Sequence, residues 1–234
     1  MKQGRMLIIE GTCVLTLVIF LLLVRGAYGN PLDADIAQIQ KTYETMGDIQ
    51  AYFVQESVVK SWNAEQVQKA QGKVFFKKEG KMFWDYQEPT SQQIISDGNT
   101  LWFYEPEDKQ VTITTVGEGF QSQISADLLN GKAHLKRDFD ITEMTSEAER
   151  NAGKLVLQLI PRSSQQNLSK ILLRLDRNTF IIYQTEVYDL FDNLTRITFS
   201  QIQIDTNLAD VLFTFTPPPG VEILAPPTIP FPQQ

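Results

Sequence analysis

The chain has almost none of the side chains that usually build metal and redox sites. Its 234 residues include one cysteine, Cys13, and one histidine, His134. One cysteine cannot form an internal disulfide, and one histidine cannot complete a typical zinc site or a cysteine–histidine nucleophile pair. We therefore expect no metal site and no cofactor, and we expect His134 to lie in an exposed loop.

Known catalytic motifs are also missing. The sequence contains neither the GxxxxGK[ST] loop of nucleotide-binding proteins nor the GxSxG turn of serine hydrolases. Carboxylates are plentiful, and a pair such as Asp85 and Asp97 could in principle serve as acid and base. Nothing in the pattern separates that pair from an ordinary acidic surface. We therefore predict no catalytic residues and a protein that is not an enzyme.

The longest uncharged run lies at the N-terminus. Lys2 and Arg5 precede the apolar residues 11–24, and Ala27-Tyr28-Gly29 offers small residues at the positions that a signal peptidase reads. This predicts a cleavable signal peptide over residues 1–29. The alternative is a membrane anchor, because residues 6–24 carry only the charge of Glu10. The short apolar core favours cleavage, and Cys13 lacks the preceding Leu-x-small pattern of a lipoprotein signal.

Positive charge is scarce in the remaining chain. Loss of residues 1–29 removes three basic residues and one acidic residue, which changes the formal net charge from −7 to about −9. Such a surface is a poor partner for nucleic acid. Residues 30–221 are enough for one domain with a substantial core. Prolines gather after residue 216, so we expect residues 222–234 to form an extended, Pro-rich tail.

Most of the predicted domain is strand. Runs of Val, Ile, Phe, Tyr and Leu alternate with turn signals at Asp97-Gly98, Asp176 to Asn178 and Asp192-Asn193. A change of apolar parity near Ser200 predicts a β-bulge in a long, bent strand. A further short extended piece is expected at 213–216. The eleven predicted strands form an antiparallel meander and span residues 50–60, 71–78, 81–87, 92–96, 100–105, 109–115, 137–144, 154–161, 169–176, 180–188 and 194–205.

Two amphipathic helices are expected beside these strands. In residues 32–46 the apolar positions repeat every three or four residues and stop at Gly47, which predicts a helix that lies across a sheet. In residues 121–130, Ile124 and Leu128 lie one turn apart. Packing on an ordinary core is the simplest account of both apolar stripes.

Aromatic residues are concentrated in the central strands. Eight of them lie between Phe75 and Tyr104, so several strands carry large apolar groups on both faces. A sheet with one wet face should alternate more regularly. Both faces of these strands are therefore expected to be covered, by packed protein or by an apolar ligand.

Two segments of the sequence resemble a known family. GKVFFKKEGKMFWDY, IISDGNTLWFY and Glu105-Pro106 in the first half, and FTFTPPPGV at 213–221, resemble the outer-membrane lipoprotein carrier family (LolA). The resemblance implies a mainly β fold with helices (α+β), a strongly curved antiparallel half-barrel of about eleven strands covered by amphipathic lid helices. It also implies a monomeric periplasmic chaperone that binds the acyl chains of lipoproteins. Its implied partners are an inner-membrane ABC transporter of the Lol type and an outer-membrane lipoprotein receptor.

The resemblance also implies roles for particular residues. Met82 and Trp84 are expected to wall the lipid cavity, with Trp102 and Tyr104 as neighbours. Phe76 joins them only if the β-turn around Glu79-Gly80 is one residue longer than a two-residue turn. Three residues are assigned to the lid: Lys78, Ile124 and Leu128. The family usually has an Arg-Pro pair where this chain has Lys78-Glu79, and a lysine would hold a lid less rigidly than an arginine.

The sequence leaves other functions open. A related half-barrel receptor of the outer membrane (LolB) would need a lipid-attachment cysteine. A periplasmic lipid-binding sensor would be expected to carry a second domain. An enzyme acting on lipid or glycan is disfavoured by the missing motifs.

Overall fold

The computed structural model describes residues 30–61, 64–116, 134–163 and 168–224. Contacts divide the chain into two units, residues 1–35 and residues 36–234, with the boundary inside the first described helix. The predicted signal peptide and the predicted helix at 121–130 lie outside the described residues. In the part of the chain that the structure describes, no helix is long and apolar enough to cross a membrane.

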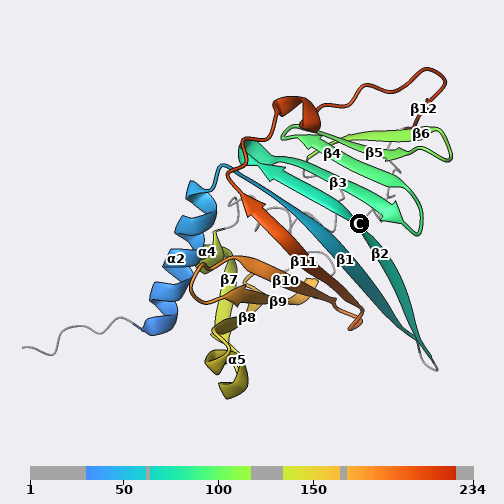
Figure 1. Ribbon diagram of the computed structural model, residues 1–234. Helices are drawn as coiled ribbons and strands as arrows, with labels where there is room; N and C mark the ends of the chain where they lie inside the picture. The colour runs from blue at the N-terminus through green and yellow to red at the C-terminus, as the bar shows by residue number, and fades with distance from the viewer. Residues whose placement is uncertain (1–29, 62–63, 117–133, 164–167, 225–234) are drawn as a thin grey trace, which may run out of the picture. The chain divides into compact units, whose positions relative to one another are not determined.

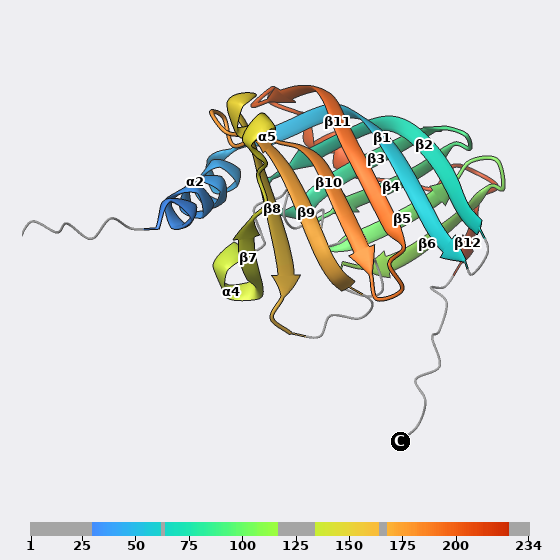
Figure 2. The same cartoon turned by 90° about the horizontal axis from the view of Figure 1, so that it is seen from below.

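One twelve-stranded sheet organises the second unit, and it is open and curved (Figures 1 and 2). The strand order is β12-β6-β5-β4-β3-β2-β1-β11-β10-β9-β8-β7. The strands are β1 (Asp48–Ser61), β2 (Ala64–Lys77), β3 (Lys81–Glu88), β4 (Gln92–Asp97), β5 (Thr100–Glu105), β6 (Gln110–Thr115), β7 (Phe139–Glu143), β8 (Lys154–Pro161), β9 (Leu168–Asp176), β10 (Ile182–Asp189), β11 (Leu194–Ile204) and β12 (Glu222–Leu224).

Each of the eleven predicted strands is present, but β2 begins at Ala64 and not at residue 71, and the arrangement differs from a single meander. β1 to β6 form one antiparallel meander and β7 to β11 form a second. β6 and β7 do not pair, and the two meanders are joined by the antiparallel pairing of β1 with β11. The sequence between β6 and β7 does not reveal the pairing of β1 with β11, because local turn residues predict only the pairing of strands that follow one another.

The polar turns of the sheet are built as the sequence predicts. Asp97 Oδ1 accepts the N–H groups of Asn99 and Thr100, at 2.8 Å each. Asp176 Oδ1 does the same for Asn178 and Thr179, at 3.0 and 3.1 Å. These side chains replace main-chain partners where the strand reverses, which is why Asp is common at turns.

Two local irregularities allow the long strands to bend. Between β1 and β11, Tyr52 pairs with Ser200 whereas Gln50 pairs with Gln203, and Gln201 has φ of 50°. This is the bulge predicted near Ser200. At Gly72 a Cβ atom would lie 1.9 Å from the main-chain oxygen of Asp85. Only glycine lets β3 approach β2 so closely at this point.

Helix α2 (Pro31–Thr45) is the longest of the described helices, with 15 residues, and each of the others has five or fewer. Helix α2 begins with Asn30 Oδ1 accepting the N–H of Leu32 at 3.2 Å, and a proline suits its first turn. Helix α5 (Glu147–Asn151) begins with a capping box between Ser146 and Glu149. The remaining helical segments are α4 (Leu135–Asp138) and the 3-10 turns η1 (Lys78–Gly80) and η2 (Asp210–Phe213).

The strand register separates two faces of the sheet. One face, here called the inner face, carries an apolar set that crosses both meanders, and most of this set is buried. Its members include Ile49, Phe53, Val74, Phe76, Met82, Trp84, Ile94, Leu101, Leu157, Leu159, Ile171, Leu173, Ile197 and Phe199. The other face, the outer face, is polar along β9, β10 and β11.

The C-terminal segment differs from the sequence expectation. The short extended piece expected at 213–216 begins with the last residue of η2, Phe213, which is fully buried. Helix η2 lies against β3 and β4. The apolar residues here pack side chains onto the sheet instead of adding a strand to its edge. Glu222 to Leu224, placed by the sequence in the tail, pair in parallel with β6. Residues 225–234 lie outside the described residues.

The close approach at Gly72 generates a prediction. Gly72→Ala should lower the free energy of unfolding by about 1–3 kcal/mol, because the added methyl group meets main chain that cannot rotate away. Urea denaturation of both proteins measures the change. The matched control is Gln68→Ala at an exposed position of the same strand, where the change should stay within about 0.5 kcal/mol. Equal stability of Gly72→Ala and the parent protein would contradict the packing described.

Candidate functional site

The centre of the inner face is an aromatic cluster around Trp84. The ring of Trp84 lies 4.9 Å from the ring of Phe53 and 5.6 Å from that of Phe76, and in both pairs the ring planes are nearly perpendicular. Phe199 lies 6.4 Å away on the second meander, and Tyr86 stacks at 6.2 Å. Edge-to-face ring pairs of this kind contribute more stabilising free energy than their buried area alone would give.

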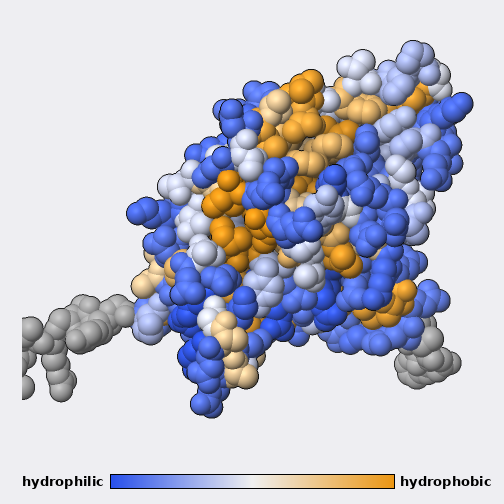
Figure 3. Space-filling model, viewed as in Figure 1, coloured by the Kyte–Doolittle hydropathy of each residue, from blue (hydrophilic) through white to orange (hydrophobic). Residues whose placement is uncertain are grey.

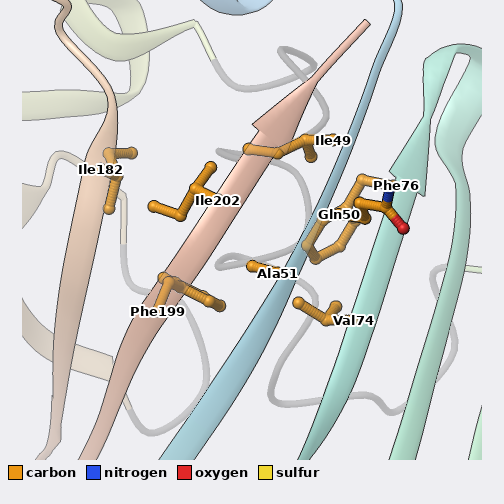
Figure 4. A pocket seen from close by; sticks show the side chains of 8 residues that line it. All are labelled: Ile49, Gln50, Ala51, Val74, Phe76, Ile182, Phe199 and Ile202. Atoms are coloured by element: carbon orange, nitrogen blue, oxygen red, sulfur yellow. The ribbon is translucent and has the colours of Figure 1, made fainter. Parts of the chain in front are cut away.

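An apolar pocket opens beside this cluster (Figure 4). Side chains from β10, β11, β1 and β2 face a common space there, so both meanders contribute to one pocket. Its volume is about 10 Å³, room for about one water molecule. The lining residues are Ile49, Gln50, Ala51, Val74, Phe76, Ile182, Phe199 and Ile202.

Three of the predicted cavity residues lie together. The β2–β3 connection has three residues, so Phe76 pairs with Met82, and Val74 pairs with Trp84. Phe76, Met82 and Trp84 therefore share the inner face, and each is almost fully buried. Of the two turn lengths considered from the sequence, the longer one is correct.

The other two predicted residues lie on the opposite face. Trp102 pairs with Ile95, which pairs with Phe83, and Tyr104 pairs with Gln93. The β4–β5 turn contains two residues, so even-numbered positions of β4 pair with odd-numbered positions of β5. In β5 the inner face is formed by Leu101 and Phe103. The expectation that Trp102 and Tyr104 neighbour Met82 and Trp84 is therefore wrong.

The aromatic residues on the outer face contact one another and the C-terminal segment. On the outer face, Phe75 and Phe83 stack at 5.6 Å, and the ring of Tyr104 lies 4.9 Å from that of Phe215. Hydrophobic residues gather over η2 in Figure 3, where Val211 is 73% exposed. Phe75, Phe83 and Tyr104 are half-buried and contact other protein rings. The inner-face rings of Phe53, Phe76 and Trp84 form a larger, almost fully buried apolar surface, so the inner face is the better candidate for a ligand.

Helix α2 covers one end of the inner face. Ile36, Ile39 and Tyr43 are buried. The Tyr43 hydroxyl accepts the N–H of Ile182 at 2.9 Å, which ties the helix to β10. Burial raises the pKa of Tyr43 well above its usual range, so the hydroxyl stays neutral. The predicted helix and its apolar stripe are confirmed.

Lys78 lies where α2 meets the sheet. Its main-chain N donates to Gly47 O at 3.2 Å, while its side chain is exposed. Both residues line a small pocket with Tyr43 and Met46. The next residue, Glu79, has φ of 69°, a conformation that proline cannot adopt. Ile124 and Leu128, the other predicted lid residues, lie outside the described residues.

Asp48 fixes the connection between α2 and β1. Its carboxylate accepts Thr206 N and Thr206 Oγ1 at 2.8 and 2.9 Å, and Leu208 N at 3.0 Å. Burial alone would raise the pKa of Asp48, but these hydrogen bonds outweigh it and hold the pKa below its usual range. The adjacent Gly47 N donates to Asp205 Oδ1 at 2.7 Å. The helix connection is therefore bonded to the segment that follows β11, a link that no local sequence pattern reveals.

A polar cleft of about 410 Å³ lies at the other end of the inner face. Tyr86, from the aromatic cluster, is part of its wall and donates to Gln55 Oε1 at 3.0 Å. Burial raises the pKa of Tyr86 to about 12. The rest of the wall comes from strand residues and from the β3–β4 and β5–β6 turns, and it includes Glu105, Glu107 and Asp108. The inner face thus passes from an apolar centre to an acidic rim.

The carboxylates considered as an acid–base pair have other tasks. Asp85 accepts hydrogen bonds from Gln87 and Gln93, and Asp97 holds the β4–β5 turn. Among the described residues, no group of three or more His, Cys, Asp or Glu side chains could hold a metal ion.

Comparison with known proteins identifies the family. The profile of the family described as "Outer membrane lipoprotein carrier protein LolA" matches residues 44–216. The chain belongs to this family. It is a family of lipoprotein carriers and not of enzymes.

Individual relatives agree over most of the chain. The chain is 32% identical over 195 residues to an outer-membrane lipoprotein carrier protein of Nitrosomonas europaea, covering 83% of this chain and 91% of the relative. A carrier protein of Dechloromonas aromatica is 28% identical over 90% of this chain and 95% of its own. An uncharacterized conserved protein of Thermus thermophilus shares the fold, with a TM-score of 0.52 at 10% identity over 84% of this chain and all of its own.

The Asp48 bonds generate a prediction about pH. Asp48→Asn should lower the free energy of unfolding at pH 7 by about 1–3 kcal/mol. The asparagine side chain has only one acceptor oxygen and no negative charge, so it cannot replace all three hydrogen bonds. The folded-state pKa lies below the unfolded value of about 3.9, so this stabilisation exists above that pH and is lost as the pH falls. Urea denaturation between pH 7 and 3 measures both effects.

The control is Asp108→Asn at an exposed position, which should match the parent protein throughout. A difference between Asp48→Asn and the parent that grew as the pH fell would contradict the assignment.

Proposed function

We propose that the protein is a periplasmic carrier that binds the acyl chains of lipoproteins on the inner face of its sheet. In this role it carries them from the inner membrane to the outer membrane. The observation that supports this most directly is the continuous apolar inner face, which runs through both meanders in a chain of the carrier family. A cleavable signal peptide over residues 1–29 would place the mature chain in the periplasm.

The carrier must replace the burial that a membrane gives an acyl chain. Each methylene moved from lipid to water costs about 0.8 kcal/mol, so a sixteen-carbon chain costs on the order of 12 kcal/mol. Aromatic rings and branched aliphatic side chains provide the apolar surface for this, with Phe53, Trp84 and Phe199 at the centre. The polar rim at Tyr86 suits the polypeptide part of the cargo.

Binding requires the cover of the inner face to move. The apolar pocket holds about 10 Å³, whereas pockets for ligands are usually about 300–1,000 Å³. In this conformation protein side chains occupy the inner face and keep it from water. We propose that α2 belongs to the moving cover and returns when the cargo leaves.

Cargo transfer needs an outside source of energy, because the sequence has no nucleotide-binding loop. We propose that an inner-membrane ABC transporter of the Lol type loads the carrier and that an outer-membrane lipoprotein receptor unloads it. Each 1.4 kcal/mol of difference between the carrier and receptor sites shifts the cargo tenfold.

The two tryptophans on opposite faces provide the test. A synthetic diacylated lipopeptide with bromine on its acyl chains should quench Trp84, which faces the proposed site, and leave Trp102 unquenched. The measurement compares Trp102→Phe with Trp84→Phe, each with Trp62 also replaced by phenylalanine. Saturable quenching is expected in the first variant and its loss in the second.

The same lipopeptide without bromine controls for changes in conformation. Quenching confined to Trp102, or absent from both variants while the lipopeptide binds, would overturn the proposed site. No binding at all would overturn the proposed function.

The contact between Tyr43 and Ile182 generates a prediction about the cover. Tyr43→Phe leaves the buried N–H of Ile182 without its acceptor, which should lower the free energy of unfolding by about 1–2 kcal/mol. Because the bond ties α2 to β10, amide exchange in α2 and the rate of lipopeptide uptake should both rise. Hydrogen exchange and stopped-flow fluorescence measure these two rates.

Tyr183→Phe is the matched control, since it removes a hydroxyl from the same strand at a ring that lies under Lys154 Nζ. Equal exchange and uptake rates in Tyr43→Phe and Tyr183→Phe would show that α2 is not part of the moving cover.

A further inference from the structure

Three buried polar atoms lack a hydrogen-bond partner among the described residues, and all three belong to the inner face. They are Trp84 Nε1, Thr114 Oγ1 and Thr185 Oγ1. Trp84 is 2% exposed and Thr185 is fully buried. The three come from β3, β6 and β10, so they are spread over both meanders of one surface.

The register places each of them on that surface. Trp84 pairs with Val74 and Ile94, and Thr185 pairs with Ile197 and Leu173. Thr114 pairs with Leu101, which pairs with Ser96 and so lies on the same face as Met82.

Unpartnered groups of this kind oppose folding. A buried donor without an acceptor costs about 1–3 kcal/mol, and proteins satisfy the large majority of such groups. Hydrocarbon neighbours cannot supply an acceptor to the indole N–H or to the two hydroxyls. Trp84 in particular is surrounded by the rings of Phe53, Phe76 and Phe199. The position of all three on the proposed binding face suggests that a ligand supplies the missing partner.

The chemistry of the three groups restricts that ligand. An indole N–H is a donor only, and each hydroxyl has a proton to donate, so the shared requirement is an acceptor. The inner-face positions of the described strands carry no lysine or arginine, so a charged carboxylate would be buried without a counter-ion. A neutral carbonyl oxygen within a mainly apolar ligand fits both conditions.

We propose that Trp84, Thr185 and Thr114 bind the ester and amide carbonyl oxygens that join acyl chains to a lipoprotein. This inference rests on the proposed function and adds the part of the cargo that the inner face recognises. Hydrocarbon contacts hold the chains, and the three polar groups fix how far each chain enters.

Thr185→Val gives the sharpest test, because it removes the hydroxyl and keeps the side-chain shape. If the hydroxyl has no partner in the empty protein, Thr185→Val should be as stable as the parent protein or more stable in urea denaturation. It should nevertheless bind a diacylated lipopeptide about tenfold more weakly. The matched control is Thr198→Val, an exposed threonine on the outer face of the neighbouring strand, which should bind as the parent does.

The probe itself identifies the carbonyl. The parent protein should bind an ester-linked lipopeptide about tenfold more tightly than its ether-linked analogue, which has the same chains without the ester carbonyls. In Thr185→Val and in Trp84→Phe this preference should shrink. A phospholipid pair, ester-linked and ether-linked, distinguishes lipoprotein from membrane lipid as the source of the carbonyl.

The possible outcomes separate carbonyl recognition from acyl-chain binding. Equal binding of ester and ether lipopeptides by the parent protein would overturn the carbonyl inference and leave acyl-chain binding intact. Loss of stability in Thr185→Val would show that a partner such as a trapped water already satisfies the hydroxyl, and would remove Thr185. An ester preference seen with phospholipid alone would assign the groups to membrane lipid and overturn their assignment to the cargo. If neither lipopeptide bound, the proposed carrier function itself would be overturned.

Discussion

The pairing of β1 with β11 is the constraint on which the rest of the structure depends. Each meander by itself has an apolar face that neither could bury alone, and this pairing joins the two faces into one. It places Phe53 opposite Phe199 and brings the second meander against the aromatic cluster of the first. The bulge at Gln201 keeps the two apolar faces aligned while β11 bends, because a single unpaired residue restores the alternation of side chains. Without this register there would be two half-cores and no continuous inner face.

A continuous apolar face creates a conflict between stability and function. In water it must be covered, yet a carrier must uncover it to admit cargo. Helix α2 makes apolar contacts along one stripe and only a few polar bonds, at Gln40, at Tyr43 and beside Gly47. Few hydrogen bonds need to break for the helix to move, whereas the strands below are joined by full ladders. Differences in local stability of this kind separate moving elements from the scaffold that positions them.

The sequence predicts what depends on neighbours along the chain, and fails where distant strands decide. Strand positions, the α2 stripe, the Asp turns and the bulge near Ser200 all follow from local alternation and turn chemistry. The faces of Trp102 and Tyr104 do not, because each turn between β3 and β5 can reverse the parity of everything after it. Phe76 shows the same sensitivity, since one extra residue in the β2–β3 turn places it beside Met82. The union of β1 with β11 and the C-terminal cover of the outer face are long-range choices with no local signal.

The aromatic residues of the central strands therefore form two groups with different roles, one on each face of the sheet. The outer group contains the stacked pair Phe75–Phe83, which links β2 to β3, and the pair Tyr104–Phe215, which links β5 to the C-terminal segment. The inner group can then exchange partners without loss of the sheet, because the outer-face ring contacts and the strand ladders do not depend on it. A purely hydrocarbon surface would hold acyl chains at any depth, since hydrophobic contact has no direction. The unpartnered donors on the inner face can fix the position of a ligand. A ligand with carbonyl groups would also remove the free-energy penalty that these donors have in the empty protein.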